Sequence, residues 1–365
     1  HGCLWIHCAS VGEFEQARPV LEAIKQVRPT LPVLVTFFSP SGYQARKDHP
    51  LATHVEYLPP DTATNAARFL ALVKPCMAVF IKYEFWYQHL HALRATQVPT
   101  YIVSAIFRPS QPFFKWYGEA YRSMLACFDR LFVQNEASRL LLADIGIHQV
   151  TVNGDTRFDR VMRIVNHDEE LPLARTFRNG ADTPVLVAGS TWPDDERLLF
   201  EALRHIPALR LMAAPHELIT SHLEALASRA PAPLARWSGG PPGPEARTLW
   251  VDHMGFLSRL YKYADITYVG GGFGSGIHNT LEAAAWGKPV IFGPNHARFA
   301  EAQGLIEAGA GFCVKNAEEL QALLQRFAQD KNALERASYA ARTYVADRVG
   351  ATDSITAALL TQLGR

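Results

Sequence analysis

The sequence has few cysteines and almost no net charge, and both features exclude classes of protein. Its five cysteines among 365 residues show no C-x-x-C spacing. We therefore expect neither a zinc ribbon nor a disulfide framework, and the odd count favours reduced thiols. The net charge of +1 provides no basic field for nucleic acid, so no nucleic-acid partner is expected.

Long apolar runs and common metal motifs are also missing. No stretch approaches the about 18 apolar residues that span a membrane. There is no H-E-x-x-H and no D-x-D pair at a strand end, so neither a metal nor a cofactor is expected. Asp194 and Asp195, after a proline, look like first-turn helix acids. Because the chain starts at His1, we expect a missing N-terminal segment, which leaves open an anchor outside this chain.

Short apolar runs that alternate with helical patterns predict the α/β class, with doubly wound parallel sheets. The expected strands cover 32–38, 78–81, 100–105, 130–134, 184–189, 209–214, 265–270, 289–293 and 311–314, and helices are expected at 17–27, 63–72 and 137–145.

The length and a break in this alternation predict two domains, since a domain typically has about 150 residues. The expected domains are 1–166 and 183–345, joined by a polar linker at 167–182. A C-terminal helix, 346–365, is expected to pack back on the first domain. The Pro/Gly-rich stretch 237–245 predicts a surface loop. Two such domains would place a ligand cleft between the carboxyl ends of their sheets.

The glycine run Y-V-G-G-G-F-G-S-G-I-H-N-T-L-E, 268–282, predicts a strand, a loop and a helix from His278 or Asn279 to Gly287. Glycines and a helix N-terminus together favour a phosphate site. The spacing matches neither the dinucleotide fingerprint nor the P-loop. Glu282 shares a helix face with Asn279 and His278 and can bind ribose hydroxyls. The alternative, a simple tight turn, is disfavoured by the entropy cost of so many small residues.

Two glutamates follow apolar segments, Glu13 after the short apolar run 4–8 and Glu84 after an expected strand. Glu13, in C-A-S-V-G-E-F-E-Q at 8–16, stands where a helix begins. From spacing alone, a catalytic base and a dipole-stabilising helix residue are equally compatible with it. Glu15 is expected to be a solvated surface charge. Glu84 follows the strand 78–81, where active sites collect, although it could also be the buried partner of an arginine.

Ordered motifs connect these features. They are W-I-H-x-x-S-V-G-E at 5–13, F-S-P-S-G at 38–42, E-F-W at 84–86, Q-N-E at 134–136, A-G-S-T at 188–191, A-P-H-E at 214–217, D-H-M-G at 252–255 and H-N-x-L-E-x-A-x-x-G-K-P-V-x-F-G-P at 278–294. The set resembles that of the bacterial 3-deoxy-D-manno-octulosonic acid (Kdo) transferases. The resemblance implies a GT-B glycosyltransferase with two Rossmann-like domains that face a central cleft.

The resemblance also implies an activity and a location. Such enzymes move Kdo from CMP-Kdo to a lipid A precursor of the lipid IVA type, in lipopolysaccharide biosynthesis. They work at the cytoplasmic face of the inner membrane, held peripherally or by an N-terminal anchor. It further implies an inverting transfer with Glu13 as the general base, and with Glu84 positioning the acceptor or stabilising the transition state.

The resemblance assigns further residues to the two substrates. Those on the donor (CMP) side are Pro215, His216, Met254, Gly255, Phe256, Gly274, Gly276, Ile277, His278, Asn279, Thr280, Leu281 and Glu282, and those on the acceptor side are Gly12, Ser39, Ser41 and Gly42. Ser190 and Thr191 either donate hydrogen bonds to the donor or cap the helix near Pro193.

The chain departs from the family pattern at three places. Lys82 replaces the first glutamate of E-x-E-x-W, the arginine of P-R-H is absent beside His216, and Phe256 replaces an acid. The acidic donor sugar calls for a cation, and the candidates, which the sequence does not rank, are Arg46, Lys47, Lys82 and Arg157.

The aromatic and basic segment 107–125, with Lys115, Trp116 and Arg122, predicts contact with the inner-membrane surface, with core packing as the alternative. Two rival functions remain open. One is another GT-B enzyme with a different nucleotide sugar, such as a UDP-sugar transferase or epimerase. The other is a non-catalytic glycolipid-binding protein. The ordered motifs favour the Kdo transferase.

Overall fold

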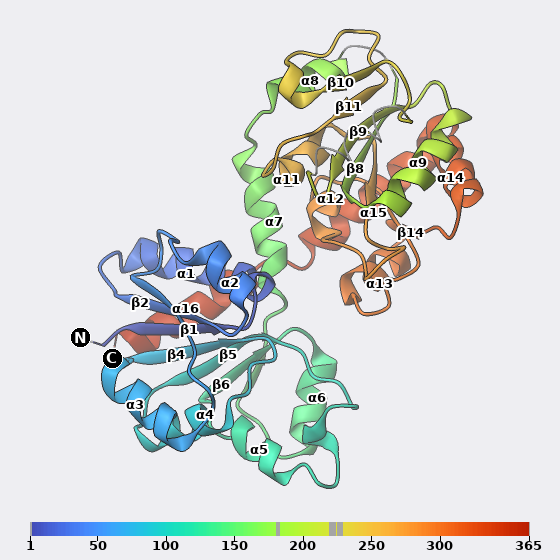
Figure 1. The fold of residues 1–365 in the computed structure, drawn as a ribbon. Helices are drawn as coiled ribbons and strands as arrows, with labels where there is room; N and C mark the ends of the chain where they lie inside the picture. The colour runs from blue at the N-terminus through green and yellow to red at the C-terminus, as the bar shows by residue number, and fades with distance from the viewer. Residues whose placement is uncertain (1, 180–182, 219–223, 225–228, 365) are drawn as a thin grey trace. The chain divides into compact units, whose positions relative to one another are not determined.

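The computed structural model describes residues 2–179, 183–218, 224 and 229–364. The chain forms two compact units, each described by itself (Figure 1). The first unit comprises His1–Arg160 with Arg348–Arg365, and the second comprises Val161–Asp347.

The first unit is built on a seven-stranded sheet in the order β3-β2-β1-β4-β5-β6-β7, with all pairs parallel. The strands are β1 (Leu4–Cys8), β2 (Val33–Phe37), β3 (His54–Tyr57), β4 (Met77–Ile81), β5 (Thr100–Ala105), β6 (Arg130–Val133) and β7 (Val150–Val152). All residues of β1, β2 and β4 are buried, as expected for parallel strands covered on both faces.

Helices cover both faces of this sheet. Core residues of α1 (Val11–Val27) and α16 (Ala351–Leu363) pack on one face. The other face is packed by α3 (Ala63–Val73), α4 (Tyr87–Ala95), α5 (Glu119–Leu125) and α6 (Glu136–Asp144). The short helices α2 (Pro40–Arg46) and η1 (Pro112–Phe114) complete the unit, and α7 (Thr156–His167) leads out of it.

The C-terminal helix α16 belongs to the first unit, although it is the last element of the chain. Asp159 of α7 fixes its first turn, because the Asp159 carboxylate accepts hydrogen bonds from the Gly350 and Thr352 N–H groups and from the Thr352 hydroxyl. Ala351, Ile355 and Leu359 then complete the core beneath α1.

The second unit repeats this plan. Its seven-stranded sheet has the order β10-β11-β9-β8-β12-β13-β14. The strands are β8 (Val185–Thr191), β9 (Arg210–Pro215), β10 (Leu234–Arg236), β11 (Thr248–Trp250), β12 (Ile266–Val269), β13 (Val290–Phe292) and β14 (Gly311–Cys313). The helices are α8 (Pro172–Asn179), α9 (Pro193–Arg204), η2 (Trp237–Gly239), α11 (Leu257–Leu260), η3 (Tyr261–Tyr263), α12 (Leu281–Ala285), α13 (Ala300–Glu307), α14 (Ala317–Gln329) and α15 (Lys331–Ala346).

Both sheets have a topological switch point, where two neighbouring strands send their helices to opposite faces. In the first sheet this point lies between β1 and β4, and in the second it lies between β8 and β12. Ligands of open α/β sheets bind outside the carboxyl ends of strands at such points. The segments that follow these four strands are therefore the first place to look for a site.

The predicted α/β class with doubly wound sheets is confirmed, and each predicted strand overlaps an observed one. Strands β1, β3, β7, β10 and β11 are additional, and β1 coincides with the apolar run Leu4–Cys8. The other four are short, and β3 exposes three of its four residues, so no long apolar run marks them. The expected linker differs from the structure, because it contains α8, in which Ala174 and Phe177 are buried. Its residues 180–182 lie outside the described ones.

Candidate active site

Glu13 lies in the first turn of α1, just beyond the carboxyl end of β1. The helix begins at Val11, close to the start that the sequence predicted at Glu13, because Ser10 caps it. Ser10 Oγ accepts a hydrogen bond from the Glu13 N–H at 3.4 Å, and Glu13 Oε2 accepts one from the Ala9 N–H at 2.5 Å. This reciprocal arrangement resembles a capping box. It holds the half-buried carboxyl group of Glu13 at the switch point of the first sheet.

Glu84 lies beyond the end of β4, the strand next to β1. Its Oε2 accepts hydrogen bonds from His7 Nε2 at 3.0 Å and from Trp86 Nε1 at 2.8 Å. Its observed partners are thus a histidine and a tryptophan, rather than the arginine considered from the sequence. Both donors fix the orientation of the carboxylate.

A buried chain of polar side chains supports Glu84 from within the sheet. Trp5 Nε1 donates a hydrogen bond to Thr36 Oγ1 at 2.8 Å, and Thr36 Oγ1 lies 2.8 Å from His7 Nδ1. With Trp5 donating to Thr36, the Thr36 hydroxyl has its own proton to give to His7 Nδ1. His7 Nε2–H then donates to Glu84. Sequence reasoning missed this chain, although W-I-H was among the quoted motifs.

The charge of Glu84 acts electrostatically on Glu13. Burial and the negative charge of Glu84 raise the pKa of Glu13 from 4.5 to about 7, while the Ala9 N–H and the Lys82 charge oppose this rise. A pKa near the working pH is what a general base requires. Lys82, which stands where the family pattern has a glutamate, therefore helps to keep Glu13 ionised.

The residues assigned to the acceptor lie after β1 and β2, which are neighbours in the sheet. Ser39 caps α2, since its Oγ accepts from the Gly42 N–H at 3.0 Å, and it lies 3.4 Å from Ser41 Oγ. A side chain at Gly42 would place Cβ 2.6 Å from Phe37 Cδ1. Ser39 and Gly42 thus have structural roles at this edge, while Ser41 and Gly12 are exposed.

Glu15 is not the solvated surface charge that the sequence suggested. Its side chain is buried and forms ion pairs with Arg46 at 2.6 Å and Arg160 at 2.9 Å. The sequence pattern could not show this environment, because the two arginines come from other helices, α2 and α7. Arg46 is thereby paired with a buried carboxylate.

The other candidate cations differ in environment. Arg157 pairs with the buried carboxylate of Asp155 at 2.8 Å, and Lys47 is exposed. Lys82 acts on Glu13 and stacks its ammonium group over the Tyr83 ring at 5.2 Å. Of the four candidates, Lys82 is the one with a described effect on the candidate base.

In the second unit, Asp195 organises the glycine loop. It is a first-turn acid of α9, as predicted, and it is also buried. Its carboxylate accepts hydrogen bonds from Tyr268 Oη at 2.7 Å, from the Gly271 N–H at 2.8 Å and from the Trp192 N–H at 2.9 Å. Asp195 thus connects the segments that follow β8 and β12 across the switch point.

The glycine loop is longer, and its helix shorter, than predicted. The His278 N–H bonds back to the Gly270 carbonyl, so α12 begins only at Leu281 and ends at Ala285. The φ of Gly276 is +136°, a conformation that needs glycine. Asn279 Nδ2 donates to Glu282 Oε1 at 3.1 Å, in keeping with their predicted common face.

His278 belongs to a group of three rings in mutual contact. The His216 ring stacks against both Trp192 and His278, with centroid distances of 4.6 and 4.5 Å. Trp192 Nε1 also donates to His278 Nε2 at 3.1 Å. Burial and the neighbouring His216 lower the pKa of His278, so its ring is neutral and carries its proton on Nδ1. Trp192 was missed from the sequence.

The remaining donor-side residues border this region. Met254 and Gly255 are exposed after β11, while Phe256 packs against Trp237 and His253, both at 5.1 Å between ring centroids. Thr191 Oγ1 donates to Glu196 at 2.9 Å. Pro215, Gly276, Ile277, Thr280 and Leu281 are buried, and Gly274 and His216 are exposed.

The described residues were compared with the requirements of a metal site and of a membrane-spanning helix. Among them, no group of three or more His, Cys, Asp or Glu side chains is arranged to hold a metal ion. Within the same part of the chain, no helix combines the length and apolarity needed to cross a bilayer.

Two doubly wound parallel sheets, each with polar residues at its switch point, define a protein of the GT-B class. The same fold is seen in UDP-GlcNAc 2-epimerase from Neisseria meningitidis, with a TM-score of 0.68, 16% identity and coverage of 99% of this chain and 100% of that one. MurG from Acinetobacter baumannii has a TM-score of 0.63, 13% identity and coverage of 99% and 100%.

Sequence comparison identifies the family within this class. Residues 1–160 match the family described as 3-deoxy-D-manno-octulosonic-acid transferase (kdotransferase). The 3-deoxy-D-manno-octulosonic acid transferase of Bordetella pertussis is 32% identical over 99% of this chain and 87% of that protein. The enzyme of the same name from Rickettsia bellii is 27% identical over 92% and 82%. The chain belongs to the Kdo transferase family and is a glycosyltransferase.

The coupling of the two glutamates can be measured by titration. Glu84→Gln should lower the pKa of Glu13 below about 7, because the repulsion is lost. Lys82→Met should raise it, because an attraction is lost. Carboxyl-carbon NMR titration of the three proteins reads these shifts, with Glu22→Gln as a control. An unchanged Glu13 titration in Glu84→Gln would contradict the coupling.

The same raised pKa predicts how stability depends on pH. A folded-state pKa of about 7 against an ordinary 4.5 means that Glu13 binds its proton more tightly in the folded state. The stabilisation of the folded state by this bound proton is therefore fully present below pH 4.5 and is lost as the pH rises to about 7. The stability of Glu13→Gln relative to wild type should accordingly increase between pH 5 and 8, roughly the window between the two values.

The role of Asp195 in holding the glycine loop can be tested by comparing its substitution with that of Asp194. Asp195→Ala should lower the free energy of unfolding by about 1–3 kcal/mol, because it leaves buried donors without their acceptor. Asp194→Ala removes an exposed acid from the same turn and should change little. Urea unfolding of both variants makes the comparison, and equal losses would show that Asp195 does not have this anchoring role.

Proposed function

We propose that this enzyme transfers Kdo from CMP-Kdo to a lipid A precursor of the lipid IVA type, in lipopolysaccharide biosynthesis. Membership of the Kdo transferase family supports the reaction class. The observation that carries the mechanism is the pair Glu13 and Glu84 at the first switch point, where Glu13 has a pKa of about 7.

Glu13 is proposed as the general base of a single, inverting displacement. It takes the proton of the acceptor hydroxyl while the acceptor oxygen bonds to the anomeric carbon, and the bond from that carbon to the CMP phosphate oxygen breaks. No covalent enzyme intermediate is then needed. His7 and Trp86 hold Glu84, whose negative charge keeps the affinity of Glu13 for the proton high. Glu84 is also placed to orient the acceptor.

CMP departs as an anion and needs hydrogen-bond donors. The proposed donors are the backbone N–H groups of the glycine loop and the Nδ1–H of His278, which Trp192 keeps in this tautomer. Glu282, linked to Asn279, is proposed to bind the ribose hydroxyls. Such an arrangement stabilises a monophosphate without a cation, and we propose that no metal or other cofactor takes part.

The remaining polar residues at the first edge are assigned to the sugars. Gly12, Ser39, Ser41 and Gly42 are proposed to border the acceptor sugar. Lys82 is proposed to attract the carboxylate of the donor sugar, because it is the candidate cation that acts on Glu13.

The enzyme is proposed to work at the cytoplasmic face of the inner membrane. The segment between η1 and α5 presents Trp116 at 93% exposure and Tyr117 at 53%, next to Lys115. Aromatic rings with a basic neighbour suit the interface of an anionic bilayer. Arg122 serves instead to hold this segment, since it donates to the carbonyls of Phe113 and Lys115.

The activity test measures Kdo transfer from CMP-Kdo to a tetra-acylated lipid A precursor. Wild type should transfer, and Glu13→Gln should lower kcat by about a hundred-fold or more. Glu136→Gln is the matched control, because Glu136 is also a first-turn glutamate but is exposed. Thermal stabilisation by CMP should persist in all three proteins, which shows that the donor side is intact.

The possible outcomes separate the rival assignments. Full activity in Glu13→Gln would show that Glu13 is not the general base. Stabilisation by UDP but not by CMP would favour another nucleotide-sugar enzyme of the same fold. Binding of CMP without transfer by wild type to any acylated acceptor would reject the proposed reaction.

Membrane contact is tested with vesicles that contain anionic lipid. A double variant, Trp116→Ala with Tyr117→Ala, should bind several-fold more weakly, because two interfacial rings are lost. Leu72→Ala is the control, since Leu72 is 81% exposed on α3. Unchanged sedimentation of the double variant with vesicles would reject this surface.

A further inference from the structure

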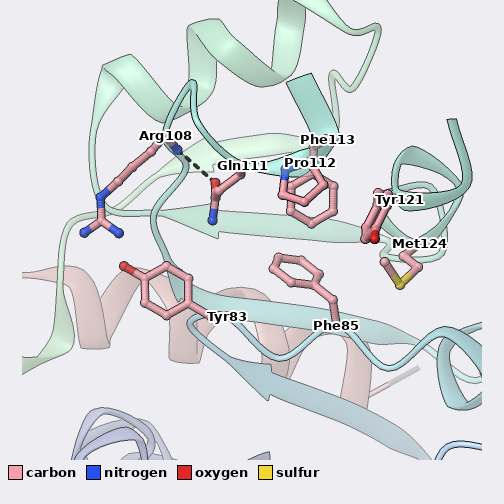
Figure 2. Close-up of a pocket in the computed structure, with 8 residues that line it drawn as sticks. All are labelled: Tyr83, Phe85, Arg108, Gln111, Pro112, Phe113, Tyr121 and Met124. Atoms are coloured by element: carbon pink, nitrogen blue, oxygen red, sulfur yellow. Dashed lines mark hydrogen bonds between the residues drawn. The ribbon is translucent and has the colours of Figure 1, made fainter. Parts of the chain in front are cut away.

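The first unit contains a pocket of about 440 Å³ that none of the assignments above uses. It lies between the segment after β4 and the segment that contains η1 and α5 (Figure 2). Its lining residues are Tyr83, Phe85, Arg108, Gln111, Pro112, Phe113, Tyr121 and Met124. Its volume falls in the about 300–1,000 Å³ range of small-ligand sites.

The pocket has one apolar end and one polar end. Figure 2 shows Phe85, Phe113, Tyr121 and Met124 grouped at one end. The Phe85 and Phe113 rings meet edge to face at 4.8 Å, and Phe113 lies 6.1 Å from Tyr121 between ring centroids. These contacts give a wall without charge that suits a hydrocarbon chain.

At the other end, Figure 2 shows Tyr83, Arg108 and Gln111 together. The Arg108 guanidinium lies 5.8 Å from the Tyr83 ring centroid, and the Lys82 ammonium lies 5.2 Å from it. The Gln111 side chain holds this loop, because its Oε1 accepts from the Arg108 N–H at 2.9 Å. Among the lining residues, the polar end therefore holds the Arg108 cation.

The charges around this end favour an anion. Asp155 is the carboxylate with a described effect on Tyr83, and it is paired with Arg157. Burial raises the pKa of Tyr83, so its hydroxyl stays neutral and can donate a hydrogen bond. A ligand with a phosphate at one end and an alkyl chain at the other matches both parts of the pocket.

The position of the pocket connects it to the proposed reaction. Tyr83 and Phe85 flank Glu84 in the sequence, and Lys82 acts on the charge of Glu13. The polar end of a lipid held here, at Tyr83, would therefore lie next to Glu84 along the chain. On the proposed function, the lipid that must reach these groups is the acceptor.

We infer that this pocket binds one acyl chain of the lipid acceptor, with an anionic head group of that lipid at Arg108. The inference rests on the proposed function for the identity of the lipid, but the binding of an anionic amphiphile does not depend on that function. The two parts can thus be tested separately.

The binding test uses dodecyl phosphate below its micelle concentration, followed by calorimetry. Tyr121→Ser should weaken binding about five-fold through loss of an aromatic wall. Tyr57→Ser is the matched control, because Tyr57 is 42% and Tyr121 41% exposed, and it should bind as wild type does. Arg108→Gln should weaken binding of dodecyl phosphate but not of the uncharged dodecyl maltoside. No binding, or equal effects of the two tyrosine variants, would overturn the pocket.

The kinetic test compares a tetra-acylated acceptor with its chemically deacylated form. Tyr121→Ser should raise KM for the acylated acceptor about five-fold and leave KM for the deacylated one unchanged. If Tyr121→Ser weakens dodecyl phosphate binding but leaves both KM values unchanged, the pocket holds another lipid and the acceptor assignment is wrong. If wild type transfers to neither acceptor while dodecyl phosphate binds, the proposed function fails, and with it the identity of the lipid.

Discussion

The strand order of the two sheets is the constraint on which both candidate sites depend. A parallel strand sends its chain away over one face of the sheet, and at one place in each sheet two neighbours send theirs to opposite faces. The carboxyl ends at that place are left uncovered, between β1 and β4 and between β8 and β12. Side chains far apart in the sequence, such as Glu13 and Glu84, are neighbours for this reason.

Buried hydrogen bonds then fix the positions of the side chains and loops that the strand order brings together. In the first unit, the chain from Trp5 through Thr36 and His7 ends on Glu84. In the second, Asp195 binds both segments that border its switch point. Each unsatisfied group in such a network would cost free energy, so the network allows few arrangements. Both sites therefore rest on side chains that take no direct part in the proposed chemistry.

The sequence was sufficient for the fold class and for most strands, because parallel strands are buried on both faces and appear as apolar runs. It was insufficient for β3, whose exposed residues leave no such run. It led to the candidate residues Glu13, Glu84 and His278, since each follows a predicted strand or loop. It could not identify Trp192 or assign a role to His7, because their roles arise from contacts with residues 86 and 77 positions away. Glu15 was misjudged because its partners, Arg46 and Arg160, come from helices elsewhere in the sequence.

The return of α16 to the first unit has a consequence for synthesis on the ribosome. Residues 1–160 emerge first, but the apolar surface beneath α1 is covered only when Ala351, Ile355 and Leu359 arrive. Until then, the nascent first unit exposes part of its core while the whole second unit is translated. The first unit therefore completes its core only after α16 has been synthesised, and not when the strands of its sheet are all present.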